Sequence, residues 1–173
     1  MVELRADARR NLERVLDAAT EVFAASGPDA SVDEIAKRAG VGHATVFRRF
    51  PTKDDLMYAV IERRVEEMRA IAEESLAADD PGQAFFDFVH RVASLSMSSP
   101  GIHKCVAQCG EKPGAAELEA LGVKIVARAQ RAGALRADLD PAEVVPFIRD
   151  TLTAAPAGKW QTYLEVVLAG LRA

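Results

Sequence analysis

The residues best suited to chemistry are basic side chains that lie close together in one stretch of the sequence. Between Ile35 and Lys53 there are five Lys or Arg residues, one histidine (His43) and no acid. Salt screens charges that lie more than about 8–10 Å apart, so a local excess of one sign matters more than the net charge. The stretch therefore indicates a polyanion as partner, although an ordinary solvated basic face has the same composition.

The net charge of the whole chain points away from a nucleic acid. The 173 residues include 22 Lys and Arg and 26 Asp and Glu, which gives a formal charge of −4. Residues 1–53 hold nine basic and eight acidic groups, residues 54–120 hold six and thirteen, and residues 121–173 hold seven and five. The acidic excess thus belongs to the middle of the chain and leaves the basic stretch intact.

A second group with possible chemistry is His103, Cys105 and Cys109. The two cysteines share a helical face at i and i+4, whereas His103 points away from that face by about 200°. Three ligands on imperfect faces make a poor zinc site, so we expect no metal and treat thiol sensing as an alternative to structural cysteines. Because no apolar leader follows the first charges, we also expect a cytoplasmic protein without a disulfide framework.

Motifs of catalysis and of membrane insertion are absent from the sequence. It contains no Gly-rich phosphate loop, no G-x-S-x-G and no H-E-x-x-H, and its histidines have no evident carboxylate and nucleophile around them. No uncharged apolar run reaches eighteen residues, so no membrane-spanning helix is expected. We therefore predict that the chain is neither an enzyme nor a membrane protein.

The apolar spacing has the helical period throughout, and no segment alternates long enough to form a strand. We predict an all-α fold of about nine helices. The expected ranges are 9–26, 31–39, 43–49, 53–77, 81–96, 101–108, 115–132, 141–154 and 159–171. Ser31 and Glu34 fit a reciprocal capping box, Gly40 fits a left-handed stop, and Pro146 should kink or loosen its helix.

The second and third helices, joined by a glycine-containing turn, form a helix-turn-helix. At about 100° per residue, Val46 and Phe50 face the core, while Ala44 and Arg48 face outward. Such a face suits the major groove, because Arg can bind guanine O6 and N7 and a neighbouring Thr45 can meet thymine.

Residues 31–56, SVDEIAKRAGVGHATVFRRFPTKDDL, resemble the operator-binding core of TetR-family transcriptional regulators. The resemblance extends over about residues 9–68, and a looser one covers Gly133-Ala134-Leu135-Arg136-Ala137-Asp138-Leu139 near the C-terminus. It implies an N-terminal three-helix DNA-binding domain at 1–52 (motif about 31–50), a linking helix at 53–77, and a C-terminal helical bundle at 78–173 that binds the effector and dimerises. The DNA contacts that it implies are Ser31, Gly42, His43, Ala44, Thr45, Phe47, Arg48, Arg49 and Lys53.

Three residues depart from the family pattern. Phe47 stands where the family commonly has a tyrosine that donates to a phosphate, and Arg49 stands where a histidine is common. Gly42 replaces a Ser or Thr helix cap, which weakens the cap slightly. The departures concern the phosphate contacts and leave the family resemblance unchanged.

The resemblance also implies a small-molecule effector, an unidentified ligand rather than a cofactor, that binds among the later helices. The pocket residues expected on this basis are Met68, Phe85, Phe88, Val92, Met97, His103, Cys105 and Trp160. Few basic groups lie in this region, which favours an apolar or aromatic effector over a charged one. Packing in an ordinary core is the alternative for each of these residues.

A homodimer is the further implication, formed by the last two helices of each chain. These helices carry more apolar surface than one thin subunit needs, and the interface residues expected are Val144, Val145, Ile148, Leu152, Leu164, Val167, Leu168 and Leu171. Two recognition helices about 34–36 Å apart would read a near-palindromic site on double-stranded DNA. We expect a repressor that the effector releases; an architectural DNA-binding protein without effector is the alternative.

Overall fold

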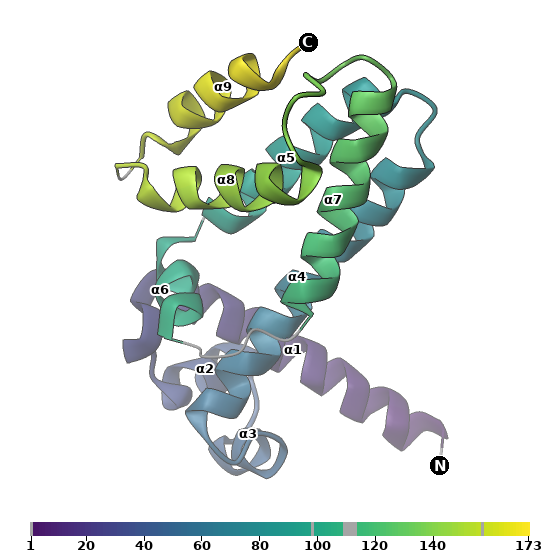
Figure 1. Ribbon diagram of the computed structural model, residues 1–173. Coiled ribbons are helices and arrows are strands. Elements are labelled where there is room, and N and C mark those ends of the chain that lie inside the picture. The colour runs from purple at the N-terminus through teal and green to yellow at the C-terminus, as the bar shows by residue number, and fades with distance from the viewer. Residues whose placement is uncertain (1, 98, 109–113, 157) are drawn as a thin grey trace. The chain divides into compact units, whose positions relative to one another are not determined.

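The computed structural model describes residues 2–97, 99–108, 114–156 and 158–173, which are almost entirely helical (Figure 1). These parts form nine α-helices and one 3-10 helix: α1 (Val2–Ser26), η1 (Gly27–Asp29), α2 (Val32–Ala39), α3 (His43–Arg49), α4 (Lys53–Ala77), α5 (Pro81–Met97), α6 (Pro100–Gln108), α7 (Ala115–Arg131), α8 (Pro141–Ala154) and α9 (Trp160–Leu171). The all-α prediction is confirmed. The largest difference in bounds is at α1, which begins seven residues before the expected Arg9.

The helices belong to two compact units, which we call the first and the second unit. The first consists of residues 1–64 and 98–113, and the second of residues 65–97 and 114–173. The predicted domain boundaries therefore differ from the observed division, which falls within α4 and assigns α6 to the first unit. None of the helices in the described ranges is both long and apolar enough to cross a lipid bilayer.

The first unit is built around α1, whose inner face packs against α2 and α6. Its largest fully buried side chains are Phe23, Ile35, Leu56, Val22, Val46 and Cys105. Burial of one large apolar side chain stabilises a fold by roughly 1.5–3 kcal/mol, so these residues supply much of the unit's cohesion. Leu56 and Val46 belong to this set, and their burial anchors α3 and the start of α4 to the same core.

A left-handed residue closes α2 and sets the direction of α3. Gly40 has φ +64° and ψ 36°, a conformation that side-chain-bearing residues rarely adopt. The Val41 amide donates to the Ala36 carbonyl at 3.1 Å, which completes the helix end. The predicted glycine stop is thereby confirmed, and the chain turns into α3 within three residues.

The expected capping box at Ser31 is wrong, although Ser31 is the residue that precedes α2. Its hydroxyl makes no capping hydrogen bond, and the Glu34 carboxylate lies 3.7 Å from Arg38 one turn later. A reciprocal box is present instead at α4, where the Asp55 amide donates to the Thr52 hydroxyl at 3.1 Å and the Thr52 amide donates to Asp55 at 2.9 Å. The charge attraction between Glu34 and Arg38 thus competes with the capping geometry at α2.

Helix α6 belongs to the first unit because a glycine lets it approach the α1 backbone. A Cβ on Gly101 would collide with the carbonyl oxygens of Phe23 and Ala24, so only a residue without a side chain fits there. Gly27 of η1 also lies against Gly101. This close approach, which apolar spacing does not reveal, accounts for the place of α6 in the first unit.

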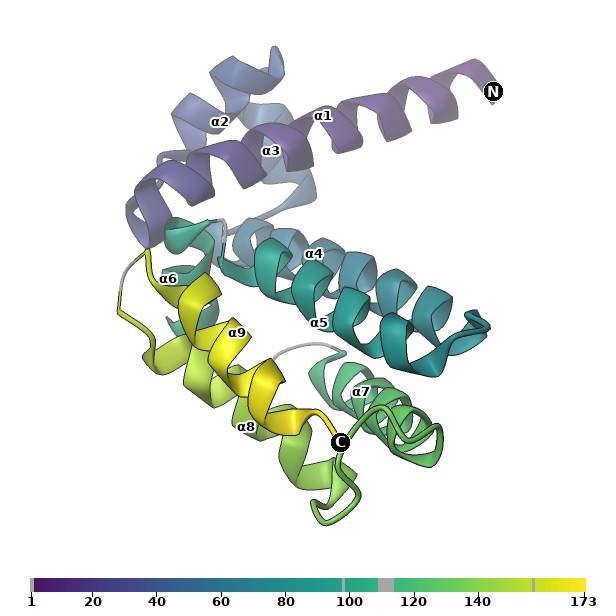
Figure 2. The ribbon, with the colours of Figure 1, turned by 90° about the horizontal axis from the view of Figure 1, so that it is seen from above.

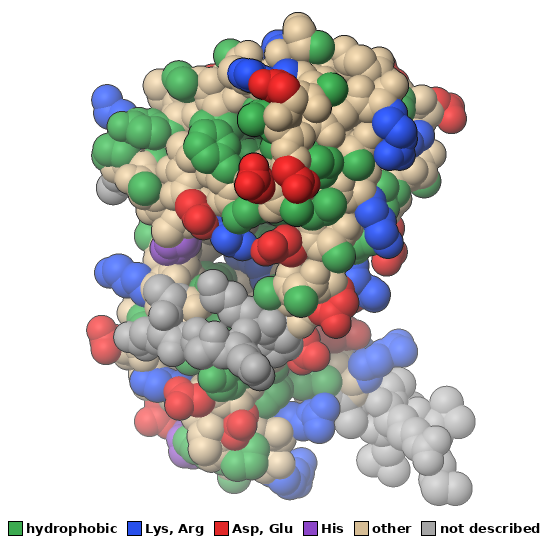
Figure 3. All heavy atoms as spheres, in the orientation of Figure 1, with side chains coloured by type: hydrophobic (Ala, Val, Ile, Leu, Met, Phe, Trp, Pro, Cys, Tyr) green, Lys and Arg blue, Asp and Glu red, His purple; other side chains and the backbone are tan. Residues whose placement is uncertain are grey.

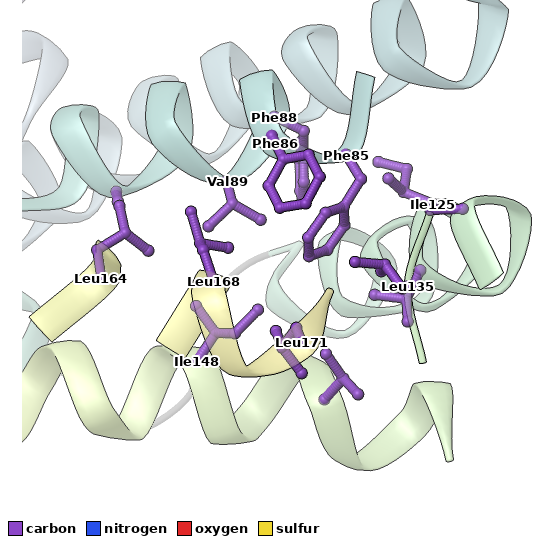
Figure 4. Packing of buried hydrophobic residues seen from close by; sticks show 14 of the residues in the cluster. Phe85, Phe86, Phe88, Val89, Ile125, Leu135, Ile148, Leu164, Leu168 and Leu171 are labelled. Carbon is purple, nitrogen blue, oxygen red and sulfur yellow. The ribbon is translucent and has the colours of Figure 1, made fainter. Parts of the chain in front are cut away.

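The second unit buries a cluster of apolar side chains contributed by α5, α7, α8 and α9 (Figure 4). Phe85 and Phe86 lie edge to face with ring centroids 5.2 Å apart, and Leu168 and Leu171 reach them from α9. Figures 1 and 2 show α9 running along α8, and α7 beside α5. Helix α8 continues through Pro146 from Pro141 to Ala154.

Polar contacts secure the ends of this cluster. The Arg128 guanidinium donates to the carbonyls of Ser75 and Ala78 at the end of α4. The C-terminal strand-like bridge pairs Leu135 with Arg172, whose guanidinium stands 4.1 Å above the Phe86 ring. Arg128 and Arg172 therefore stabilise the fold of the second unit, and the guanidinium of each contacts partners within that unit.

Candidate nucleic-acid interface

The outward face of α3 carries small, polar and basic side chains. Ala44, Arg48 and Arg49 are exposed and Thr45 is half-buried, whereas Val46 is buried against the core. The helix thus buries the side expected from its sequence and leaves the opposite side accessible. A face of this composition can approach base edges in a major groove.

Two exposed arginines, Arg48 and Arg49, lie in the last turn of α3. Within the described residues, neither Arg48 nor Arg49 has an acidic side chain within ion-pair distance. Arg38 on α2 differs, because Glu21 of α1 lies 2.9 Å from its guanidinium and Glu34 lies 3.7 Å away. Arg48 and Arg49 can therefore meet phosphates or bases without first breaking an ion pair to a described residue.

Lys53 has a contact within the chain that the sequence did not indicate. Its ammonium donates to the Pro28 carbonyl of η1 at 2.6 Å and is half-buried. An ammonium has three N–H donors, so two remain for other acceptors. Ser31 and Gly42, which directly precede α2 and α3, are both exposed, and neither helix start has a side-chain cap.

His43, the first residue of α3, lies between an acid and an aromatic ring. Its Nε2 is 3.2 Å from Oδ1 of Asp33 on α2, and its ring centroid is 4.4 Å from that of Phe47. Basic, acidic and histidine side chains share the surface of this region in Figure 3. Sequence reasoning named His43 and Phe47 but missed Asp33, because the basic stretch was counted from Ile35, two residues after this acid.

Comparisons with known proteins identify the family to which this arrangement belongs. Residues 15–60 match the model of the tetR family of bacterial regulatory proteins, and residues 80–173 match that of the C-terminal domain of SbtR-like transcriptional regulators. The solved structures include the crystal structure of the TetR transcription regulatory protein from Mycobacterium vanbaalenii, whose sequence is 39% identical to this chain. The two structures match with a TM-score of 0.74, and the match covers 98% of this chain and 99% of that chain. The chain belongs to the TetR family.

Two curated relatives agree with this assignment of a TetR-family regulator. The uncharacterized HTH-type transcriptional regulator TtgW of Pseudomonas putida is 32% identical over 110 residues, which are 61% of this chain and 82% of that protein. The HTH-type transcriptional repressor Rv3405c of Mycobacterium tuberculosis is 41% identical over 66 residues, 38% of this chain and 35% of that protein. The family and these relatives are DNA-binding transcription regulators and not enzymes.

The structure distributes the expected effector-pocket residues over both units of the regulator. Phe85 and Phe88 are buried in the cluster of the second unit, and Val92, Met97 and Trp160 pack against it. Met68 is half-buried on the part of α4 that belongs to the same unit. His103 and Cys105 lie on α6 in the first unit, where Cys105 is buried.

The residues expected at the dimer interface lie inside the chain's own core. Six of them are buried in the second-unit cluster, and Val145 and Val167 pack against it. The large apolar side chains that α8 and α9 leave exposed are Phe147 (55%), Tyr163 (41%) and Val166 (70%). The apolar stripe that the sequence showed on these helices therefore points inward, and a different face is available to a partner.

Metal ligation finds no support among the described residues. In that part of the chain, no three His, Cys, Asp or Glu side chains are placed to hold an ion. Cys109, which was considered together with His103 and Cys105, lies outside the described residues.

Proposed function

We propose that this TetR-family regulator is a cytoplasmic repressor that binds a near-palindromic operator as a homodimer and leaves it when a small apolar or aromatic effector binds. The observation that carries the DNA-binding part is the exposed face of α3, where Arg48 and Arg49 have no acidic partner among the described residues. The name of the related repressor from M. tuberculosis supports repression as the mode.

Each residue of the α3 region has a role in the proposed complex. Arg48 binds guanine O6 and N7, while Thr45 and Ala44 allow close approach to the neighbouring base. Arg49 and the two remaining donors of Lys53 bind phosphates, as do the free amides that follow Ser31 and Gly42. Phe47 lacks a hydroxyl, so its contribution is to hold the ring of His43.

Selection of bound sequences from random DNA by the purified full chain tests this function. Arg48→Ala should relax the preferred sequence and cost about 1–3 kcal/mol on the operator, because its contact is with a base. Lys53→Ala should weaken operator and random DNA alike and reduce the salt dependence of binding.

Arg131→Ala, which removes an exposed arginine of the second unit, is the control and should leave both affinities unchanged. Equal losses on operator and random DNA for Arg48→Ala would contradict its role in sequence reading.

The proposed dimer uses the exposed face of α8 and α9 in place of the residues first expected. Phe147, Tyr163 and Val166 are large apolar side chains that a monomer would leave in water, and association would bury them.

Sedimentation at micromolar concentration should show a dimer for the wild type. Phe147→Glu with Val166→Glu should give monomers with an unchanged helical content, and Glu165→Lys on the same helix should stay dimeric. A dimer that persists in the double variant would place the interface elsewhere.

The proposed effector binds to the aromatic cluster of the second unit. Phe85, Phe88 and Trp160 offer apolar surface there, and the nearby Arg128 is already occupied by the carbonyls of α4. Trp160 is the only tryptophan of the chain, so its fluorescence reports on ligands in this region. Compounds that change this fluorescence should also release the operator. If compounds bind without any effect on the operator complex, the alternative of an architectural protein gains support.

A further inference from the structure

The contact between Asp33 and His43 is the polar feature of the candidate interface that the proposed function leaves unused. The two atoms Oδ1 and Nε2 lie 3.2 Å apart, and they connect the first turn of α2 with the first residue of α3. Both side chains remain accessible, with 82% of the Asp33 side chain and 53% of the His43 side chain exposed. The pair is thus a surface feature and contributes little to the buried core.

The position of the pair decides what it can meet. In a helix-turn-helix, the N-terminal residues of the recognition helix approach the base edges. His43 is the N-terminal residue of α3, so the carboxylate that accompanies it lies at the same end. An acid at this place is repelled by phosphates, and it therefore needs either a partner in the DNA or one in the protein.

Two other acids near α2 lie beside an arginine, whereas Asp33 lies beside a histidine. Glu21 and Glu34 both lie within ion-pair distance of Arg38. Asp33 has its contact with His43, whose ring is in turn held against Phe47. One carboxylate, whose side chain is 82% exposed, therefore lies beside the N-terminal residue of α3 and can accept hydrogen bonds.

We infer that Asp33 is a specificity-determining residue of this regulator, which accepts a hydrogen bond from the amino group of a cytosine in the major groove. A carboxylate accepts from the N4 amino group of cytosine and meets only acceptors on guanine, so it selects one and rejects the other. His43 is a positioning residue, because its ring fixes the carboxylate beside the start of α3. The inference rests on the proposed DNA-binding role of α3.

Sequence selection with two variants of the full chain tests the inference. Asp33→Ala should reduce the preference for one cytosine in each half-site by about tenfold or more and should strengthen binding to random DNA severalfold, because a negative charge is removed. Asp33→Asn should move the preference at that position from cytosine toward adenine, since a carboxamide pairs with the N6 and N7 of adenine. A residue with a merely structural role would change neither preference.

Glu34→Gln is the matched control, because it removes the same charge from the neighbouring residue, whose partner is Arg38. It should leave the base preference unchanged. Adding His43→Ala to Asp33→Ala should cause no further loss of preference at the cytosine, because the two side chains act as one unit. Thermal unfolding of all variants at the wild-type temperature would show that the fold is retained.

Three outcomes separate the inference from the function on which it rests. If the wild type prefers no sequence at all, the proposed function fails and the inference fails with it. If the wild type selects an operator and neither Asp33 variant alters the selected bases, the inference alone is overturned. It is also overturned if Glu34→Gln alters the same base as Asp33→Ala, because charge alone would then explain the effect.

Discussion

The two compact units differ in what their exposed side chains offer to a partner. In the first unit, α3 exposes alanine and arginine together with the ring of Phe47, and its charge is suited to a polyanion. In the second unit, α8 and α9 expose three large apolar side chains, while the aromatic residues of α5 are enclosed. The residues proposed to bind DNA therefore lie on the surface of the first unit, whereas the residues proposed to bind the effector lie in the interior of the second. Substitutions at these surface residues of the first unit should consequently change DNA binding more than stability. Substitutions at the buried aromatic residues of the second unit should change stability first.

The sharpest test of this difference is the removal of an aromatic ring from each unit. Phe85→Ala should lower the free energy of unfolding by about 3–5 kcal/mol, because Phe85 is fully buried and leaves a cavity. Phe47→Ala should cost less than about 1 kcal/mol, since this ring is 36% exposed. Urea denaturation measures both values. Equal losses would remove the contrast between the two units.

A second test concerns the glycine that admits α6 to the first unit. Gly101→Ala should destabilise the protein by about 3 kcal/mol, because its methyl group collides with two backbone oxygens that cannot move independently. In Gly170→Ala on α9 the new methyl group meets nothing within 4 Å, so this control should stay within about 1 kcal/mol of the wild type. Amide hydrogen exchange should show faster exchange throughout α6 in the first variant. Unchanged exchange would mean that α6 does not depend on this contact.

A third test compares two arginines on the same helix, one in each unit. The Arg63 guanidinium donates to Asp17, to the Leu16 carbonyl and to the Thr20 hydroxyl of α1 at 2.6–3.1 Å. Arg63→Ala should therefore cost about 1–3 kcal/mol, because partly buried acceptors lose their donor.

Arg69→Ala removes an exposed pair with Glu66 on its own helix and should change the stability by less than about 0.5 kcal/mol. A larger effect at Arg69 than at Arg63 would show that the surface pair outweighs the link to α1.

The smallest expected effect is a dependence on pH in the second unit. The hydrogen bond from Arg136 lowers the pKa of the Asp138 carboxyl. A carboxyl whose pKa is lower in the folded than in the unfolded state stabilises the fold above its unfolded pKa of about 3.9, and the contribution disappears as the pH falls through the folded value. Asp138→Asn should thus lower Tm slightly at pH 7 and leave it unchanged near pH 2. Because the pair is exposed, a difference of several degrees at pH 7 would contradict this account.

Local signals predicted most of the fold and part of the site. The bounds of α3 and α4 agree with the expected ranges, because Gly40, Pro51 and the cap at Thr52 act over only a few residues. Val46 and Phe50 are buried as the helical period requires. These features depend on neighbours in the sequence, which are visible without a structure.

The remainder depends on contacts between distant residues. The apolar stripes of α8 and α9 identified buried residues correctly, but the period cannot tell whether another helix of the same chain or a second chain covers them. The contact of Lys53 with Pro28 and that of Asp33 with His43 each join different elements and leave no periodic trace. The placement of α6 depends on a missing Cβ, which spacing of apolar residues does not record.

Helix α6 follows a helix of the second unit in the sequence but belongs to the first unit. This assignment affects how a DNA-binding part and an effector domain from different regulators can be joined. The polypeptide passes from one unit to the other three times, within α4 and on either side of α6. The N-terminal family match ends at residue 60, so a hybrid that joins this match to a foreign effector domain would exchange the partner of α1 along with the ligand specificity. A working hybrid would have to contain residues 98–113 of this chain together with its DNA-binding part. Alternatively, the foreign domain would need a glycine at the position that corresponds to Gly101. Joining the two units of different regulators end to end is thus harder than the order of the two family matches along the sequence suggests.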